Sequence, residues 1–119
     1  MDNKEFGRQL EKRTKDFAIS IIELSIKSPL TAEGKVLKNQ ITKSGTSIGA
    51  NYREANRSRS KADFKNKIKI CESEASETGY WLEIITCFNW GDLEIVEQTT
   101  KEGSEILAIF TSIGKKLNL

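Results

Sequence analysis

The strongest constraint on the fold is an unbroken series of small and apolar residues between Phe64 and Ile85. Successive members are separated alternately by four and three residues, the spacing that keeps one face of an α-helix against neighbouring helices. A β-strand would need a period of two, which no segment of useful length shows. The chain is therefore predicted to be all-α, and the seam consists of Phe64, Ile68, Cys71, Ala75, Thr78, Leu82 and Ile85.

Three more helical segments are predicted around this one. Ser28-Pro29 ends the first, because the residue before proline disfavours helix and proline lacks an N–H group. Four helices of similar length with short connections predict an antiparallel up-down-up-down four-helix bundle, in which residues 1–119 form one domain. The predicted segments are about Gly7 to Lys27, about Ala32 to Asn56 after an N-cap at Thr31, a third after an N-cap at Ser60, and a fourth from Asp92 to about Leu117.

The segment Ile41–Ala55 combines a helical apolar rhythm with residues that helices avoid. Gly45 and Gly49 each cost about 1 kcal/mol relative to alanine in a helix interior. A loop over the glycine- and serine-rich part is the alternative, but Ile48 and Tyr52 stay in phase, which favours a helix. The glycine spacing suits close contact with another helix. A phosphate-binding loop is not indicated, since its Gly-Lys-Ser/Thr ending and preceding strand are absent.

Charge is distributed unevenly, although the net charge is only +2. Residues 1–69 carry 16 basic and 8 acidic side chains, whereas residues 70–119 carry 3 and 9. This asymmetry fits a nucleic-acid-binding face, self-association, or two halves that neutralise each other. The densest basic cluster surrounds the turn after the second helix, where it can contact phosphates or simply form a solvated rim. Its candidate nucleic-acid-binding residues are Arg53, Arg57, Arg59, Lys61 and Lys65.

A second stripe of residues lies beside the seam of the third helix and consists of Lys67, Ile70, Glu74, Glu77, Trp81, Ile84 and Phe88. Together the two stripes span about 200° of the helix circumference, at 100° per residue. An outer helix of a monomeric bundle usually shows a narrower apolar face. Trp81, Ile84 and Phe88 are therefore predicted to form an oligomer interface, in which large apolar side chains dominate the contacts.

The residue types give little support to enzymatic chemistry. The absence of histidine excludes Ser-His-Asp and Cys-His catalytic arrangements and the Glu-x-x-His motif of di-iron bundles. Glu74 and Glu77 share a helix face and admit two interpretations, a carboxylate pair for a metal or proton transfer and a structural polar network. The network is preferred, with Lys67 as a candidate counter-ion. No catalytic residue, metal or cofactor is predicted, and the network comprises Asn51, Glu54, Glu74 and Glu77.

Cellular location is predicted from the cysteines and from the apolar runs. Cys71 and Cys87 would lie about 24 Å apart on one helix, too far for a disulfide. Two unpaired thiols favour a reducing compartment. Residues 1–16 are polar and charged, unlike a signal peptide, and no apolar run approaches a membrane span. We therefore expect a cytoplasmic protein with no membrane partner.

Three motifs resemble a known bacterial family. Ile41–Ala55, Ser60–Phe64 and Glu74–Leu82 are similar to the four helix bundle protein family, also called the 23S rRNA-intervening-sequence protein or S23 ribosomal protein family. The similarity covers roughly residues 35–85 at the level of motifs. Members often have arginine where this chain has Lys43, which removes a bidentate donor at that position.

The resemblance implies a small cytoplasmic bundle that assembles as a ring-like homopentamer. The family name comes from genes inside ribosomal RNA intervening sequences, which does not establish RNA binding. A related group, the accessory proteins of diversity-generating retroelements, has a similar architecture and is thought to bind nucleic acid and a reverse transcriptase through basic surfaces. The family has no accepted catalytic residues, so none is carried over.

The predicted function is that of a non-enzymatic, oligomeric binding or scaffold protein. Its partners would be further copies of itself and, through the basic cluster, RNA or another nucleic acid. One alternative is a protein–protein interaction scaffold that binds no nucleic acid. A third interpretation is a carboxylate-based metal protein built on Glu54, Glu74 and Glu77.

Overall fold

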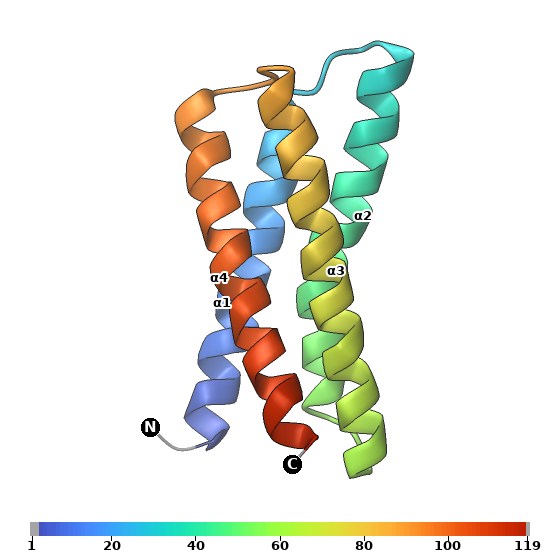
Figure 1. Cartoon of the computed structure of the whole chain (residues 1–119), viewed down its shortest axis with the longest axis vertical. Helices are drawn as coiled ribbons and strands as arrows, with labels where there is room; N and C mark the ends of the chain where they lie inside the picture. Colours follow the sequence, from blue (N-terminus) through green and yellow to red (C-terminus); the bar gives the residue numbers. More distant parts are fainter. Residues whose placement is uncertain (1–2, 119) are drawn as a thin grey trace.

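The structure, a computed structural model, describes residues 3–118 as four long α-helices side by side (Figure 1). Each helix packs against its neighbours in sequence, and α4 also contacts α1, so that α1 and α3 are diagonal, as are α2 and α4. No strand occurs in the described part of the chain. The predicted all-α, up-down-up-down bundle is confirmed, with helices α1 (Asn3–Ser25), α2 (Ala32–Ala55), α3 (Lys61–Cys87) and α4 (Leu93–Leu117).

The helix boundaries follow the predicted caps. Thr31 Oγ1 accepts a hydrogen bond from the Gly34 N–H at 3.0 Å, which satisfies one of the free donors at the start of α2. Ser60 and Asp92 cap α3 and α4 in the same way, with bonds of 3.1 Å to the Asp63 N–H and 2.9 Å to the Glu94 N–H.

The predicted start of α1 is wrong by about a turn, because the helix begins at Asn3 rather than near Gly7. The polar residues before the apolar rhythm continue the helix, and Glu5 in the first turn interacts favourably with the helix dipole. Gly7 itself is buried against α2, with Asn56 Nδ2 3.5 Å from the position of an added Cβ. The helix thus extends to the point where it can pack on the end of α2.

The glycines of α2 bring it close to α1. A Cβ on Gly45 would lie 2.8 Å from Ile21 Cγ2, and one on Gly49 would lie 3.0 Å from Thr14 Oγ1. Both distances are shorter than ordinary van der Waals contact. The helical interpretation of this segment is therefore confirmed, and the glycines serve close packing.

One hydrophobic core extends along the bundle. The seam predicted on α3 is buried except for Phe64, which is half-buried. Phe17, Ile48 and Phe110 are among the large side chains that meet it from the other three helices, each at most 2% exposed. Aromatic rings also contact each other near the α2–α3 end, where Tyr52 meets Phe110 edge-on at a centroid distance of 5.4 Å.

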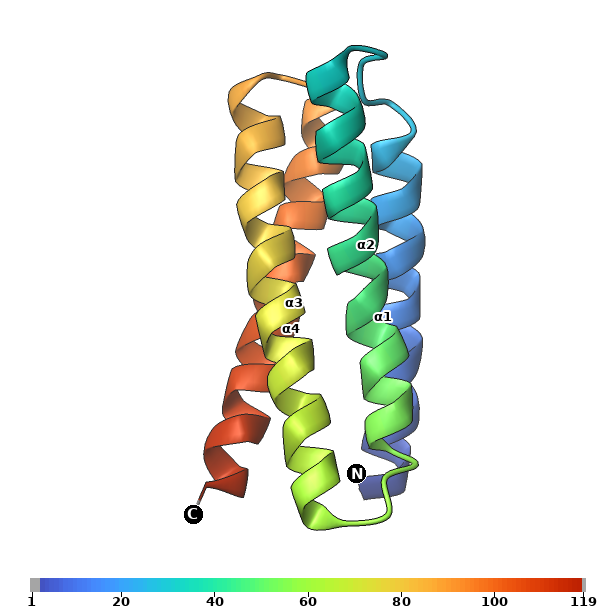
Figure 2. The same ribbon diagram turned by 90° about the vertical axis from the view of Figure 1, so that its right-hand side faces the viewer.

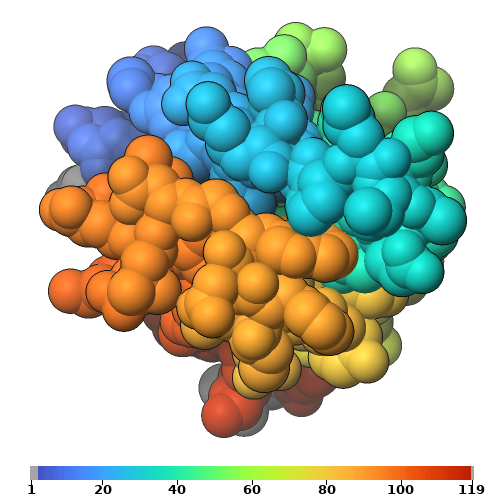
Figure 3. Space-filling model, turned by 90° about the horizontal axis from the view of Figure 1, so that it is seen from above, coloured from blue at the N-terminus to red at the C-terminus, as the bar shows by residue number. Residues whose placement is uncertain are grey.

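The bundle is elongated, with extents of 44 × 25 × 21 Å, and its two ends differ. At one end the α1–α2 and α3–α4 connections lie next to each other (Figure 3). At the other end, α1 begins, α4 ends and the α2–α3 turn reverses the chain (Figures 1 and 2). Parts of the sequence that are far apart therefore meet at this second end.

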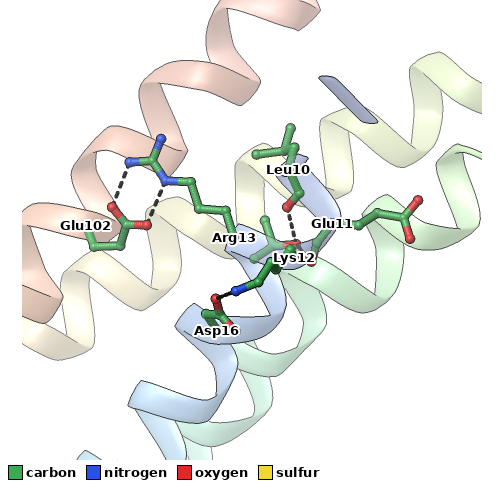
Figure 4. Close-up of polar contacts among 7 residues, drawn as sticks. Leu10, Glu11, Lys12, Arg13, Asp16 and Glu102 are labelled. Atoms are coloured by element: carbon green, nitrogen blue, oxygen red, sulfur yellow. Dashed lines mark hydrogen bonds and ion pairs between the residues drawn. The ribbon is translucent and has the colours of Figure 1, made fainter. Parts of the chain in front are cut away.

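A bidentate ion pair links α1 to α4. Arg13 Nε and Nη2 donate to the two carboxylate oxygens of Glu102, both at 2.7 Å (Figure 4). Glu105 lies 3.6 Å from the same guanidinium. The hydrogen bond to Glu102 raises the pKa of Arg13 above its usual value. Figure 4 shows Glu11 pointing to the opposite side of α1, toward α2.

Candidate nucleic-acid interface

One end of the bundle collects basic side chains from three separate parts of the sequence. Lys4 and Arg8 are in the first turns of α1, and Lys115 and Lys116 are in the last turn of α4. The α2–α3 turn lies at the same end (Figure 2). We call the nine basic residues of these three elements the basic end: Lys4, Arg8, Arg53, Arg57, Arg59, Lys61, Lys65, Lys115 and Lys116.

Five of these residues were predicted from the sequence, and four were not. Lys4, Arg8, Lys115 and Lys116 escaped because each pair is isolated from the dense cluster along the chain. The predicted bundle topology could have identified these four residues. In an up-down-up-down bundle the start of the first helix, the second connection and the end of the fourth helix lie at one end.

The predicted cluster keeps most of its charge available to an external anion. Arg57, Arg59 and Lys61 are exposed, and none of them forms an ion pair within residues 3–118. Arg53 Nε lies 3.6 Å from Glu11 Oε1, with both side chains partly exposed. Contacts of this kind stabilise by less than about 1 kcal/mol, so Arg53 remains able to exchange Glu11 for a phosphate.

A groove of about 410 Å³ separates the outer faces of α1 and α2 beside the basic end. Four of the residues that line it have small side chains. Lys15, Arg53 and Arg57 line it, together with the acids Glu11 and Glu54. These small residues are Ala18, Thr46, Gly49 and Ala50.

The groove continues toward the start of α1 as a second hollow of about 230 Å³. Glu11 lines both hollows, so they follow the same seam between the helices. Lys4 and Arg8 line the second hollow opposite Asn56, whose Nδ2 donates to Glu11 Oε2 at 2.8 Å. We call the two hollows together the α1–α2 groove.

The predicted oligomer interface lies on the last turns of α3 and its C-cap, Phe88, near the end with two connections. Trp81 and Ile84 are half-buried, and Trp81 packs on the core while its Nε1 donates to Glu77 Oε2 at 3.2 Å. Phe88 is 62% exposed, and its ring lies 5.4 Å from the ring of Trp90, which packs on the core. Part of this stripe thus closes the bundle and part faces outward.

The four residues of the predicted polar network have separate partners. Asn51 Nδ2 donates to Ser47 O of its own helix at 2.8 Å, and Glu54 pairs with Lys67 Nζ at 3.2 Å. Lys67 is therefore engaged by Glu54, and Lys43 is the cation whose charge acts on Glu74. Partial burial, followed by the negative charge of Glu77, raises the pKa of Glu74.

Comparison with known proteins gives a clear family assignment. The family model of the 23S rRNA-intervening sequence protein matches residues 8–112, which is most of the chain. The chain belongs to this family. The resemblance seen in the three motifs is thereby confirmed and extended beyond residues 35–85. No curated protein matches the sequence.

A solved structure from the S23 ribosomal protein family is also similar. It is the crystal structure of a protein with unknown function from Bacteroides thetaiotaomicron, 40% identical in sequence, with a TM-score of 0.79. The match covers 89% of this chain and 98% of that one. The chain therefore shares its fold with this member of the S23 ribosomal protein family.

The protein has a second exposed apolar surface, on α1. Ile19, Ile22 and Ile26 recur at three and four residues and are all more than 40% exposed. They continue the outer face of α1 beyond Lys15, toward the α1–α2 connection. The outer face of this helix is thus basic at one end and apolar at the other.

Among residues 3–118, His, Cys, Asp and Glu side chains do not gather in groups of three or more that could hold a metal ion. Glu54, Glu74 and Glu77 thus do not form a metal cluster. Both cysteines are free, as expected from their predicted separation along α3. Cys71 is buried and Cys87 is exposed. None of the helices in the described chain has the length and apolar character of a membrane span.

Proposed function

We propose that this protein is a non-enzymatic, oligomeric protein that binds RNA or another nucleic acid. The observation that carries the proposal is the basic end, where nine cations from three elements outnumber the four acids found there among residues 3–118. Basic side chains that lack protein partners release counterions when they meet phosphates, which makes such binding favourable and salt-dependent. The four acids at this end are Glu5, Glu11, Glu54 and Asp63.

Self-association would multiply the basic end. The outward part of the α3 stripe and the isoleucines of α1 are two different apolar surfaces on diagonal helices. Contact between two unlike surfaces of identical chains is heterologous, and it closes into a ring when the rotation permits. The family resemblance implies five copies. A ring would present five basic ends to one polyanion and add avidity.

The nucleic-acid part is tested with structured RNA and the whole chain. Binding to a fluorescently labelled RNA should weaken steeply as salt rises. Neutralising two exposed cations of the turn, Arg59→Gln with Lys61→Gln, should weaken binding about tenfold. The matched control is Lys35→Gln with Lys38→Gln, which removes the same amount of charge near the start of α2, at the opposite end of the bundle. Absence of any salt-dependent binding at low ionic strength would refute this part.

Sedimentation tests the assembly. The wild-type protein should sediment as an oligomer at micromolar concentration, and Phe88→Ser should shift it toward smaller species. Ile95→Ser provides the control, because Ile95 is also half-exposed but lies on α4, outside the stripe. A stable wild-type monomer would exclude the oligomer.

A protein–protein scaffold is the second candidate. The apolar face of α1 favours it, since Ile19, Ile22 and Ile26 have no role in phosphate binding. Purification from the native host separates the candidates by the partner that remains bound, RNA in one case and protein in the other. The free thiols support a location in the reducing cytoplasm.

A further inference from the structure

We infer that the α1–α2 groove binds the phosphodiester backbone of a single extended nucleic-acid strand. This inference rests on the proposed function and assigns it a place and a class of ligand. The groove joins part of the basic end to Lys15, which lies outside it. It is therefore a different surface from the exposed turn around Arg59 and Lys61.

Charge selects a polyanion for this groove. Five basic and two acidic side chains line it, a net charge of +3. One acid, Glu54, is held by Lys67 of α3. The other, Glu11, is shared between Arg53 and Asn56 at the centre of the groove. The remaining cations, Lys4, Arg8, Lys15 and Arg57, make no ion pair within the described residues.

The shape of the groove selects an extended chain. Lys4 and Lys15 lie eleven residues apart on α1, a distance of about 16 Å along the helix, so the groove can hold more than one phosphate. Arg53 of α2 and Arg57, just after the C-cap of α2, line the groove from the other side. Packed helices have axes only about 8–10 Å apart, which leaves room for one backbone between their outer faces but not for a duplex. Gly49 and Ala50, which also line the groove, have side chains too small to keep that backbone away from the helices.

The first test compares charge removal inside and outside the groove. An unstructured, labelled single-stranded RNA is titrated with wild-type protein and with Lys15→Gln/Arg57→Gln. Affinity should fall about tenfold, and the salt slope should decrease by about 1.4, since each lost phosphate contact on a single strand contributes about 0.7. Lys12→Gln/Lys38→Gln serves as the control, because it removes the same amount of charge from the protein at two lysines that do not line the groove. Its effect should be less than about threefold.

A second variant is expected to gain affinity. Glu11→Gln removes the central negative charge and keeps an amide oxygen that can accept from Asn56. Binding of the single strand should tighten by several-fold, whereas Glu97→Gln on α4 should change it little. A purely structural role for Glu11 would not produce a gain.

The outcomes separate the groove from the proposed function. Loss of binding only with the turn variant Arg59→Gln/Lys61→Gln would overturn the groove and leave the function intact. Equal losses in the groove pair and its control, or tighter binding of duplex RNA than of the single strand, would also overturn it. Binding of inorganic polyphosphate but of no RNA would overturn both, as would wild-type protein that binds no nucleic acid at low salt.

Discussion

Thr78 Oγ1 of α3 and Ser44 Oγ of α2 are hydrogen-bonded at 2.9 Å in the core, where both residues are at most 1% exposed. Thr78 also bonds to Glu74 O at 2.7 Å. Two polar groups thus fit into an otherwise apolar seam because they satisfy each other. A buried pair of this kind favours one register of α2 against α3, since sliding either helix would leave a hydroxyl unsatisfied.

Removal of one hydroxyl should therefore lower the free energy of unfolding by more than the value of the lost hydrogen bond, because the other hydroxyl stays buried without a good partner. Thr78→Val keeps the shape but leaves Ser44 with only a long contact of 3.4 Å to Ile41 O. We expect a loss of about 1–2 kcal/mol in the free energy of unfolding, measured by urea denaturation. The double variant Ser44→Ala/Thr78→Val should lose less than the two single variants added together. Strict additivity would show that the two hydroxyls do not stabilise each other.

The glycines differ sharply in their tolerance of a methyl group. Gly45→Ala would place Cβ 2.8 Å from the fully buried Ile21, and overpacking should destabilise the protein by about 1–2 kcal/mol despite the better helix propensity of alanine. Gly79→Ala meets no atom within 4 Å and should stabilise by about 0.5–1 kcal/mol. Thermal unfolding of both variants compares them, and a more stable Gly45→Ala would contradict the close packing.

Glu74 makes stability depend on pH. Its folded-state pKa is raised, by partial burial and then by Glu77, so its contribution is complete below the ordinary value of 4.5 and is lost as pH rises through the raised pKa. Glu74→Gln should therefore stabilise the protein at pH 7, by about 0.5 kcal/mol because the group is only half-buried. At pH 4 the gain should vanish. Urea denaturation at the two pH values measures it, and an equal gain at both would exclude the charge as its cause.

The two cysteines should react with very different rates. Burial raises the pKa of the Cys71 thiol to about 12, and its Sγ donates to Ile48 O at 3.5 Å. Cys87 is exposed at the end of α3. A thiol-specific reagent at pH 8 should modify one cysteine quickly and the second only as the protein unfolds. Rapid modification of both cysteines in the native protein, or a fast phase that persists in Cys87→Ser, would contradict this assignment.

Most of the fold could be predicted because its determinants are local. Thr31, Ser60 and Asp92 are caps whose hydrogen bonds lie within three residues, so their pattern is visible in the chain. The α1 start was missed because its first turns carry no apolar rhythm. Their helicity depends on contacts with α2, such as the packing of Gly7 on Asn56, which only the tertiary structure contains.

The site was less predictable, since it is made by topology. The dense turn cluster was found, but the groove is lined by Lys15 of α1 together with Arg53 of α2 and Arg57 beyond its C-cap, which only the packing of the two helices brings to one hollow. The periodicity of apolar residues identifies the buried face of a helix, but it does not indicate which outer faces lie next to each other. The cations beside Glu54 and Glu74 were missed for a similar reason. A heptad spacing relates residues within one helix, whereas the packing of α2 against α3 places Lys67 beside Glu54 and brings the charge of Lys43 to act on Glu74.

The shared position of the first helix start, the last helix end and the α2–α3 turn has a practical consequence for experiments. Any affinity tag or fluorescent protein fused to either terminus would emerge beside the surface whose ligand is sought (Figure 1). An acidic linker there would mask weak binding, and a histidine tag would imitate it. Labels are better attached through Leu30, which is 89% exposed in the opposite connection.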